Sequence, residues 1–122
     1  MVLIDTSVWI RAIRGLGPWA SDLYHLLRAE KAVGHELVFG ELLIGDKGRR
    51  GELLSIYMQM HQAEMVSHNL VVQFVRHRKF HGRGISWIDA HLLASAIAGQ
   101  FQLWTADTNL TAIAKEMGVN WK

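Results

Sequence analysis

Short runs of apolar residues alternate along this chain with longer segments in which apolar residues recur every three or four positions. The short runs are typical of buried strands and cover residues 2–4, 31–34, 63–66, 102–105 and 119–121. The helical spacing covers residues 8–13, 19–30, 36–44, 52–60, 69–80, 86–98 and 110–117. Strands that alternate with helices in this way predict an α/β fold with a mainly parallel sheet.

The composition is that of one folded domain spanning residues 1–122, because half of the residues are hydrophobic and 20% are charged. No apolar run approaches the roughly 20 residues that a membrane-spanning helix needs. The first residues, MVLID, do not resemble a secretory signal, and the absence of cysteine excludes disulfides and thiolate metal ligands. We therefore expect a cytoplasmic protein without membrane contact.

Two acidic residues follow predicted strands. Asp5 comes directly after residues 2–4, and Asp107 lies just beyond residues 102–105. Because parallel sheets bind ligands at the carboxyl ends of their strands, both acids are expected on the side of the sheet where a site forms. Each acid has a structural alternative as the N-cap of the next helix, although Thr6 and Ser7 are equally suited to cap the first one.

Two further acids lie in predicted helices. Glu41 is the only charged residue of segment 37–44, and a carboxylate in such apolar surroundings is rare without a partner. Glu36 is the alternative to Glu41, but its neighbours are less apolar. Asp89 completes the pattern Ser86-x-x-Asp89, which would make it a capping-box residue if it had no other role.

Carboxylates gathered in one pocket repel one another unless a cation neutralises them. Without sulfur or clustered imidazole ligands, hard oxygen donors select Mg²⁺, and Mn²⁺ is able to substitute. If four acids occupy the site, thirteen Lys and Arg face only seven acids elsewhere in the chain. A basic rim around an acidic centre suits a polyanion such as RNA, whereas an ordinary mixed surface is the alternative.

Four segments of the sequence carry a resemblance to a known family. They are residues 4–10 (IDTSVWI), 40–45 (GELLIG), 85–90 (ISWIDA) and 103–107 (LWTAD). Each segment alone is weak, whereas their order and spacing across almost the whole chain are specific. The set resembles the PIN-domain family, and most closely the VapC toxins of bacterial toxin–antitoxin pairs.

The resemblance implies a three-layer PIN domain whose central parallel sheet of about five short strands is flanked by helices. It implies a Mg²⁺-dependent endoribonuclease toxin that hydrolyses RNA phosphodiester bonds, forms a homodimer and is neutralised by a cognate antitoxin protein. The catalytic, metal-binding acids of the family map onto Asp5, Glu41, Asp89 and Asp107. Thr6 or Ser7 would support the first acid and Asn109 the last, while Ala106 stands where the family commonly has a larger or basic residue.

Basic residues follow two of the acidic segments closely. Arg11 and Arg14 come after the first segment, and Lys47 and Arg49 come after the second. These four side chains are expected to bind substrate phosphates, with a solvated basic face as the alternative.

The aromatic and imidazole side chains are expected to have structural roles. Trp9, Trp87 and Trp104 each lie within four residues of a proposed ligand, and we predict that they pack beneath the site, with base stacking as the alternative. Four histidines are expected at the surface or in an interface: His25, His35, His61 and His68.

Three other functions were weighed against a nuclease. A haloacid-dehalogenase-like phosphatase needs a second Asp where Ser7 stands, and a phosphorelay receiver needs a Lys after a late strand, where Thr105 stands. The remaining alternative is a catalytically inactive PIN-like module that binds RNA or protein. The intact set of four acids argues against it.

Overall fold

The computed structural model describes residues 1–122 and has a four-stranded sheet at its centre. The strands are β1 (Val2–Ile4), β2 (Ala32–Gly34), β3 (His61–Gln62) and β4 (Gln102–Trp104). All of them pair in parallel in the order β3-β2-β1-β4, and Leu3 of β1 lies opposite Val33 of β2 and Leu103 of β4. The predicted parallel α/β fold is confirmed.

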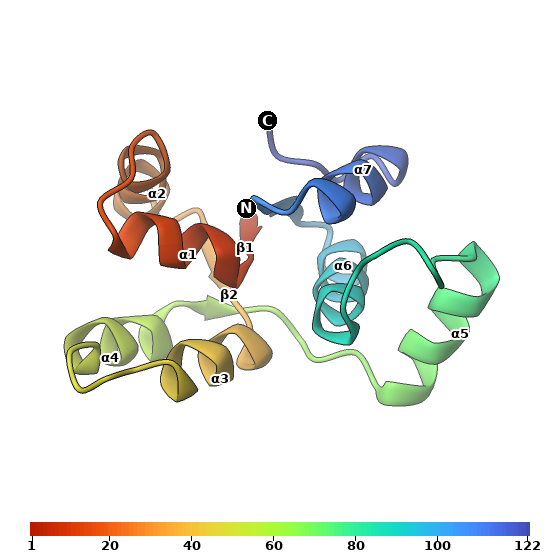
Figure 1. The fold of residues 1–122 in the computed structure, drawn as a ribbon, viewed down its shortest axis with the longest axis horizontal. Helices are drawn as coiled ribbons and strands as arrows, with labels where there is room; N and C mark the ends of the chain where they lie inside the picture. Colours follow the sequence, from red (N-terminus) through yellow and green to blue (C-terminus); the bar gives the residue numbers. More distant parts are fainter.

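Seven helices cover the sheet: α1 (Thr6–Ile13), α2 (Trp19–Arg28), α3 (Glu36–Ile44), α4 (Gly51–Gln59), α5 (His68–Arg78), α6 (Trp87–Gly99) and α7 (Thr108–Glu116). Figure 1 shows α1 to α4 on one side of the strands and α5 to α7 on the other. None of the helices combines the length and the apolar character that crossing a bilayer requires.

The order of the strands creates a point at which ligands are expected. The chain runs outward from β1 through β2 to β3 and then returns to the opposite side of β1 as β4. Open parallel sheets bind ligands at the carboxyl ends of the strands where this direction reverses. The backbone amide of Asp5 donates to the carbonyl of Trp104 over 2.9 Å, so the ends of β1 and β4 are held side by side at this point.

The core explains why these elements occupy the centre. All three residues of β1 are buried, as expected for a parallel strand with helices on both faces. Helix α6 is buried continuously over residues 90–96, and a helix in that position must be apolar on every face. Its alanines let neighbouring elements approach closely, and the first turn of the helix therefore has a fixed place at the end of β4.

The strand predicted at residues 63–66 is wrong in position. The strand is formed by His61 and Gln62, which pair with Val33 and Gly34. The side chain of Gln62 lies directly over Gly34, where a Cβ would meet its Nε2 at 2.5 Å, and only a glycine leaves that room. Val66 packs instead against the small cluster beneath α5 and α6, away from the sheet.

The predicted fifth strand is reduced to a single bridge. In segment 119–121 only Asn120 pairs with the sheet, opposite Leu103 of β4. The amide of Leu103 donates to Val119 and its carbonyl accepts from Trp121, so this segment is fixed beside β4 without forming a strand. The sheet therefore has four strands where about five were expected.

Candidate active site

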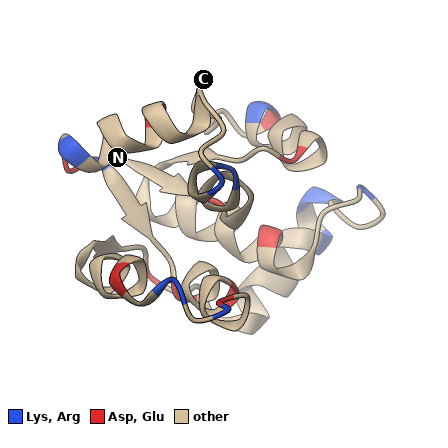
Figure 2. Ribbon diagram, turned by 60° about the vertical axis from the view of Figure 1, so that its left-hand side comes forward, with Lys and Arg blue, Asp and Glu red and all other residues tan.

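A pocket of about 490 Å³ opens where β1 and β4 end. Its walls are formed by Asp5, Thr6, Ser7, Ile10, Arg11, Arg14, Leu16, Glu41, Asp89 and Asp107. All four acids singled out in the sequence are present, and they come from the end of β1 and from α3, α6 and the start of α7. The strands themselves carry no Lys, Arg, Asp or Glu, and the coloured segments of Figure 2 lie in helices and loops.

Volume alone does not single out this pocket. A second hollow of about 490 Å³ lies beside the outer strands, lined by Leu27, Glu30, Ala32, Ile56, Gln59, Met60 and His61. It contains one carboxylate and has mostly apolar walls. The convergence of four carboxylates, together with the reversal of strand order, distinguishes the first pocket as the candidate active site.

Asp5 is held by two hydroxyls rather than serving as a helix cap. It occupies the N-cap position of α1 but makes no side-chain capping bond. Its Oδ2 accepts from the hydroxyls of Ser7 and Thr105, each over 2.7 Å, and its side chain is almost fully buried. Both donors converge on the same oxygen, so Oδ1 keeps its lone pairs for the pocket.

Glu41 projects from α3 toward the first turn of α1. Its Oε1 accepts from the hydroxyl of Thr6 over 2.6 Å, which fixes one oxygen and leaves Oε2 free. Glu36, the alternative considered from the sequence, is exposed and lines a separate hollow with Phe39 and Tyr57. The structure therefore brings Glu41, and not Glu36, together with the other acids.

Asp89 and Asp107 cap helices and line the pocket at once. Ser86 and Asp89 form the expected capping box, with the amide of Ser86 donating to Asp89 Oδ2 over 3.0 Å. Asp107 caps α7, because its Oδ1 accepts from the amide of Leu110 over 2.8 Å. In each carboxylate the second oxygen stays free, so the capping alternative and a binding role do not exclude each other.

The four acids share one hydrogen-bonding pattern. Each commits one oxygen to the protein and keeps the other free, and such oxygen donors fit Mg²⁺ or Mn²⁺. As the side chains are placed, no three acids or histidines are arranged to hold an ion. Burial raises the pKa of the Asp89 carboxyl, with a smaller contribution from the charges of Asp5 and Asp107. A bound cation would relieve that repulsion.

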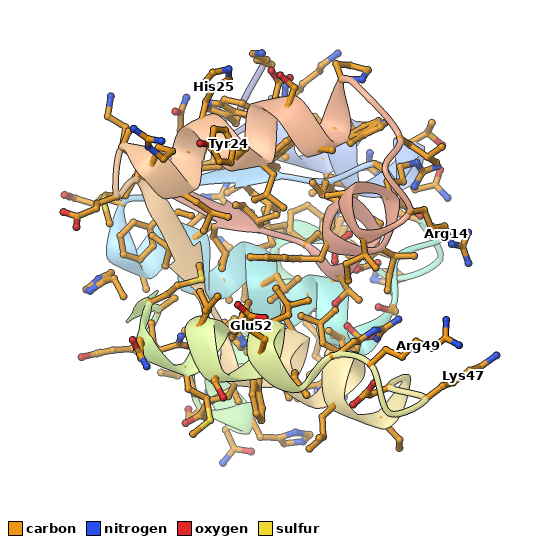
Figure 3. All side chains as sticks on the ribbon, turned by 90° about the vertical axis from the view of Figure 1, so that its left-hand side faces the viewer. Arg14, Tyr24, His25, Lys47, Arg49 and Glu52 are labelled. Atoms are coloured by element: carbon orange, nitrogen blue, oxygen red, sulfur yellow. The ribbon has the colours of Figure 1, made fainter.

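Two of the four predicted phosphate-binding residues line the pocket. Arg11 and Arg14 are in its wall, whereas Lys47 and Arg49 lie outside it, on the loop between α3 and α4. Figure 3 shows Arg14, Lys47 and Arg49 extending from the same side of the molecule. The amide of Arg49 donates to Asp46 Oδ1 over 2.9 Å, so the backbone of this basic loop is ordered.

The predicted supporting residues differ in their positions. Thr6 bonds Glu41 and Ser7 bonds Asp5, so both support an acid directly. Asn109 does not line the pocket; its amide lies 3.4 Å from the carbonyl of Gly84 and links α7 to the loop before α6.

Thr105 is a supporting residue that the sequence reasoning missed. It is buried, donates to Asp5, and accepts from the amide of Asp107 over 3.1 Å. It therefore connects the acid after β1 with the acid after β4. The signal was present in the sequence, because a hydroxyl ends the predicted strand two positions before an acid, as a mirror of Asp5 and Ser7.

Four aromatic or imidazole residues were also placed from the sequence, and the structure agrees with two of those placements. Trp9 and Trp104 are buried and pack in the core as predicted, whereas Trp87 is 43% exposed. The surface position expected for His35 is wrong, since this side chain is fully buried at the N-cap of α3. Its ring accepts from the amide of Leu37, a capping role that sequence spacing did not suggest for a histidine.

Comparisons with known proteins agree with this geometry. The PIN domain family model matches residues 2–116, and the chain belongs to the PIN-domain family. It is similar to Ribonuclease VapC32 of Mycobacterium tuberculosis, in strains CDC 1551 / Oshkosh and ATCC 25618 / H37Rv. Each of these two relatives is 38% identical over 120 residues, which cover 98% of this chain and 94% of the relative.

A solved structure supports the fold independently. The crystal structure of PAE2754 from Pyrobaculum aerophilum aligns with a TM-score of 0.59, covering 91% of this chain and 82% of that one. The two sequences are 18% identical, so the likeness concerns the fold alone. The PIN fold expected from the four segments is confirmed.

Proposed function

We propose that this protein is a Mg²⁺-dependent endoribonuclease toxin of the VapC type, with Mn²⁺ able to replace Mg²⁺. The observation that carries the proposal is the pocket in which Asp5, Glu41, Asp89 and Asp107 converge, each with one oxygen bonded to protein and one free. The similarity to Ribonuclease VapC32 over almost the full chain supports RNA as the substrate.

The four carboxylates would hold the cation, which supplies charge neutralisation and polarisation at the scissile phosphate. The remaining work falls to residues of the chain. Thr6 fixes the orientation of Glu41, and Ser7 and Thr105 fix that of Asp5, by hydrogen bonds that leave the second oxygen of each acid free. Arg11 and Arg14, which line the pocket, would bind phosphates of the RNA, and the reaction would be hydrolysis.

We also propose a cognate antitoxin protein and a second copy of this chain as partners. Support comes from the similarity to a VapC-type relative and from exposed apolar side chains on neighbouring helices. Tyr24 of α2 is 54% exposed, and Ile56 and Met58 of α4 are 49% and 68% exposed. Large exposed apolar groups of this kind mark surfaces that other chains cover.

The experiment that tests the function compares two acids of the same helix. Glu41→Gln removes the charge of a pocket carboxylate, and Glu36→Gln makes the same change on the first turn of α3, outside the pocket. We expect the unchanged protein and Glu36→Gln to cleave RNA equally with Mg²⁺ and to stop with a chelator. Glu41→Gln should cleave RNA about 100-fold more slowly or worse, because replacing even a residue that bonds a metal ligand typically reduces metal affinity or activity by about 10–100-fold.

Two results would count against the proposal. Equal cleavage by Glu41→Gln and Glu36→Gln would show that the pocket acids do not carry the chemistry. RNA binding without cleavage by the unchanged protein, at any concentration of Mg²⁺ or Mn²⁺, would leave the inactive PIN-like module as the better description. Circular dichroism of both variants provides the check that the fold is intact.

A further inference from the structure

A smaller pocket, distinct from the two described above, lies next to the candidate active site. It has a volume of about 220 Å³ and is lined by Pro18, Trp19, Asp22, Trp104, Thr105, Thr111, Asn120, Trp121 and Lys122. Trp19 stacks on Trp104 with ring centroids 5.9 Å apart and planes 18° from parallel. Trp121 lies against the same indole at 4.5 Å, tilted by 58°. Three indoles therefore form one continuous aromatic wall.

The residual fifth strand builds this pocket. The bridge between Leu103 and Asn120 holds the end of the chain beside β4, so that Trp121 reaches Trp104. The ammonium of Lys122 then bonds Asp22 of α2 over 3.1 Å. Figure 1 shows the C-terminal end of the chain between α2 and α7, the two helices that contribute the other walls.

No residue lines both the small pocket and the candidate active site, but two side-chain contacts link their walls. Thr105 lines the small pocket, and its hydroxyl donates to Asp5 over 2.7 Å. Arg11 lines the acidic pocket, and its guanidinium lies 5.3 Å from the ring centroid of Trp19. A chain whose phosphate is held beside Arg11 therefore has an aromatic surface within reach of its next base.

We propose that this aromatic pocket binds one unpaired nucleobase of the RNA substrate next to the cleaved bond and sets the base preference of cleavage. The inference rests on the proposed function and adds a specificity subsite to it. Proteins recognise single-stranded RNA by stacking splayed bases on aromatic side chains and bonding their edges. Trp19 and Trp121 are half-buried and line the pocket, and Asn120 and Thr111 supply polar groups beside them.

The pocket has room for one ring system, and its charge favours a base over a peptide side chain. The volume of about 220 Å³ falls below the roughly 300 Å³ and more of pockets that hold drug-sized ligands, so it suits one ring system. Arg11 connects the pocket to the acidic site with a positive charge, which matches the phosphate that a nucleotide brings with its base.

The test is a binding measurement in EDTA, which does not depend on cleavage. Short fluorescein-labelled single-stranded oligoribonucleotides of A, U or C are compared with an abasic oligomer that carries the same phosphates. For the preferred base, the unchanged protein should bind the base-bearing oligomer more tightly than the abasic one. Trp121→Ala should lose about tenfold in affinity for the base-bearing oligomer, the size of one stacking contact, and nothing for the abasic one.

Matched variants separate stacking from folding. Trp121→Phe keeps an aromatic ring and should retain base-dependent binding, while Asn120→Ala should narrow the difference among the bases. Leu70→Ala removes an exposed apolar side chain from α5, outside both pockets, and should change nothing.

Each outcome of this experiment decides the proposal. Equal losses for base-bearing and abasic oligomers in Trp121→Ala would overturn it, because the residue would then act through the fold or the phosphates. No loss for either oligomer would also overturn it and leave the pocket to a side chain of a protein partner. Base-dependent binding without any cleavage by the unchanged protein would support the subsite and refute the nuclease function, so the two failures are distinct.

Discussion

Lowering the pH from 7 to 5 should destabilise this protein through His35, which the fold buries in its neutral form. The ring Nδ1 accepts from the amide of Leu37 over 3.1 Å, and Nε2 lies 3.0 Å from the hydroxyl of Ser95. That hydroxyl donates to the carbonyl of Glu64 over 2.8 Å, so it accepts the Nε2 proton. A second proton would face the Leu37 amide and break the cap of α3.

The magnitude follows from the pKa of His35. Burial, with a smaller contribution from the charge of His91, lowers this pKa from 6.5 to about 4. Between these two values the unfolded chain binds a proton that the folded protein does not bind. The stabilisation is therefore complete above pH 6.5 and is lost as the pH falls toward 4. Down to pH 5 the loss amounts to about 2 kcal/mol, a large share of the ~5–15 kcal/mol of a typical domain.

The assay is urea unfolding followed by tryptophan fluorescence at pH 7 and pH 5, for the unchanged protein and for His35→Asn. Asparagine still accepts the capping bond but cannot titrate. The variant should therefore be less stable at pH 7, and its free energy of unfolding should fall by about 2 kcal/mol less than that of the unchanged protein between pH 7 and pH 5. Burial also lowers the pKa of His91, and that contribution is common to both proteins. The same loss of stability in both proteins would refute the assignment to His35.

Three further changes test the active site. Thr105→Val removes the hydroxyl that bonds Asp5 and the amide of Asp107. It should reduce the rate of RNA cleavage by about 10–100-fold and, in urea unfolding, the stability by about 1–3 kcal/mol. Asp89→Asn keeps the helix cap but removes a carboxylate whose pKa burial raises. Without metal, the midpoint of thermal unfolding of this variant should therefore rise by about 3 °C, while RNA cleavage is lost. An unchanged midpoint would contradict the repulsion of Asp89 by Asp5 and Asp107. Arg14→Ala should weaken RNA binding and reduce the slope of log affinity against log salt by about 0.7, and an unchanged slope would remove this residue from the phosphate contacts.

The elements with continuous or periodic apolar patterns could be predicted from the sequence. Strand β1 and helix α3 have the predicted bounds, because one is buried on both faces and the other is a continuous apolar helix that ends at Gly45. The strand at 63–66 could not be placed, since Val66 packs against the cluster beneath α5 and α6 and Met65 is exposed. The pairing of β3 depends on the space above Gly34, which involves residues distant in sequence.

The acids of the site could be predicted from the sequence, but not all of the residues that hydrogen-bond them could. Asp5 and Asp107 were recognisable because they follow strands, and strand order brings them together whatever their side chains do. Thr105 was missed because a buried hydroxyl gains its meaning only from its partners, Asp5 and the amide of Asp107. Asn109 was expected near the site from its position in the sequence, but its side chain turns to Gly84.

The capping roles of Asp89 and Asp107 suggest how this chain places repelling acids in one pocket. A carboxylate near a helix N-terminus accepts from backbone amides and meets a partial positive charge, which stabilises its ionised form. Three helices, α1, α6 and α7, begin at this pocket with acids at the N-cap or in the first turn. The helix ends thus offset part of the repulsion without using the second oxygen of Asp89 or Asp107, which stays available for a cation. The capping positions of Asp89 and Asp107, which are typical of ordinary helices, therefore also stabilise the acidic site in this fold.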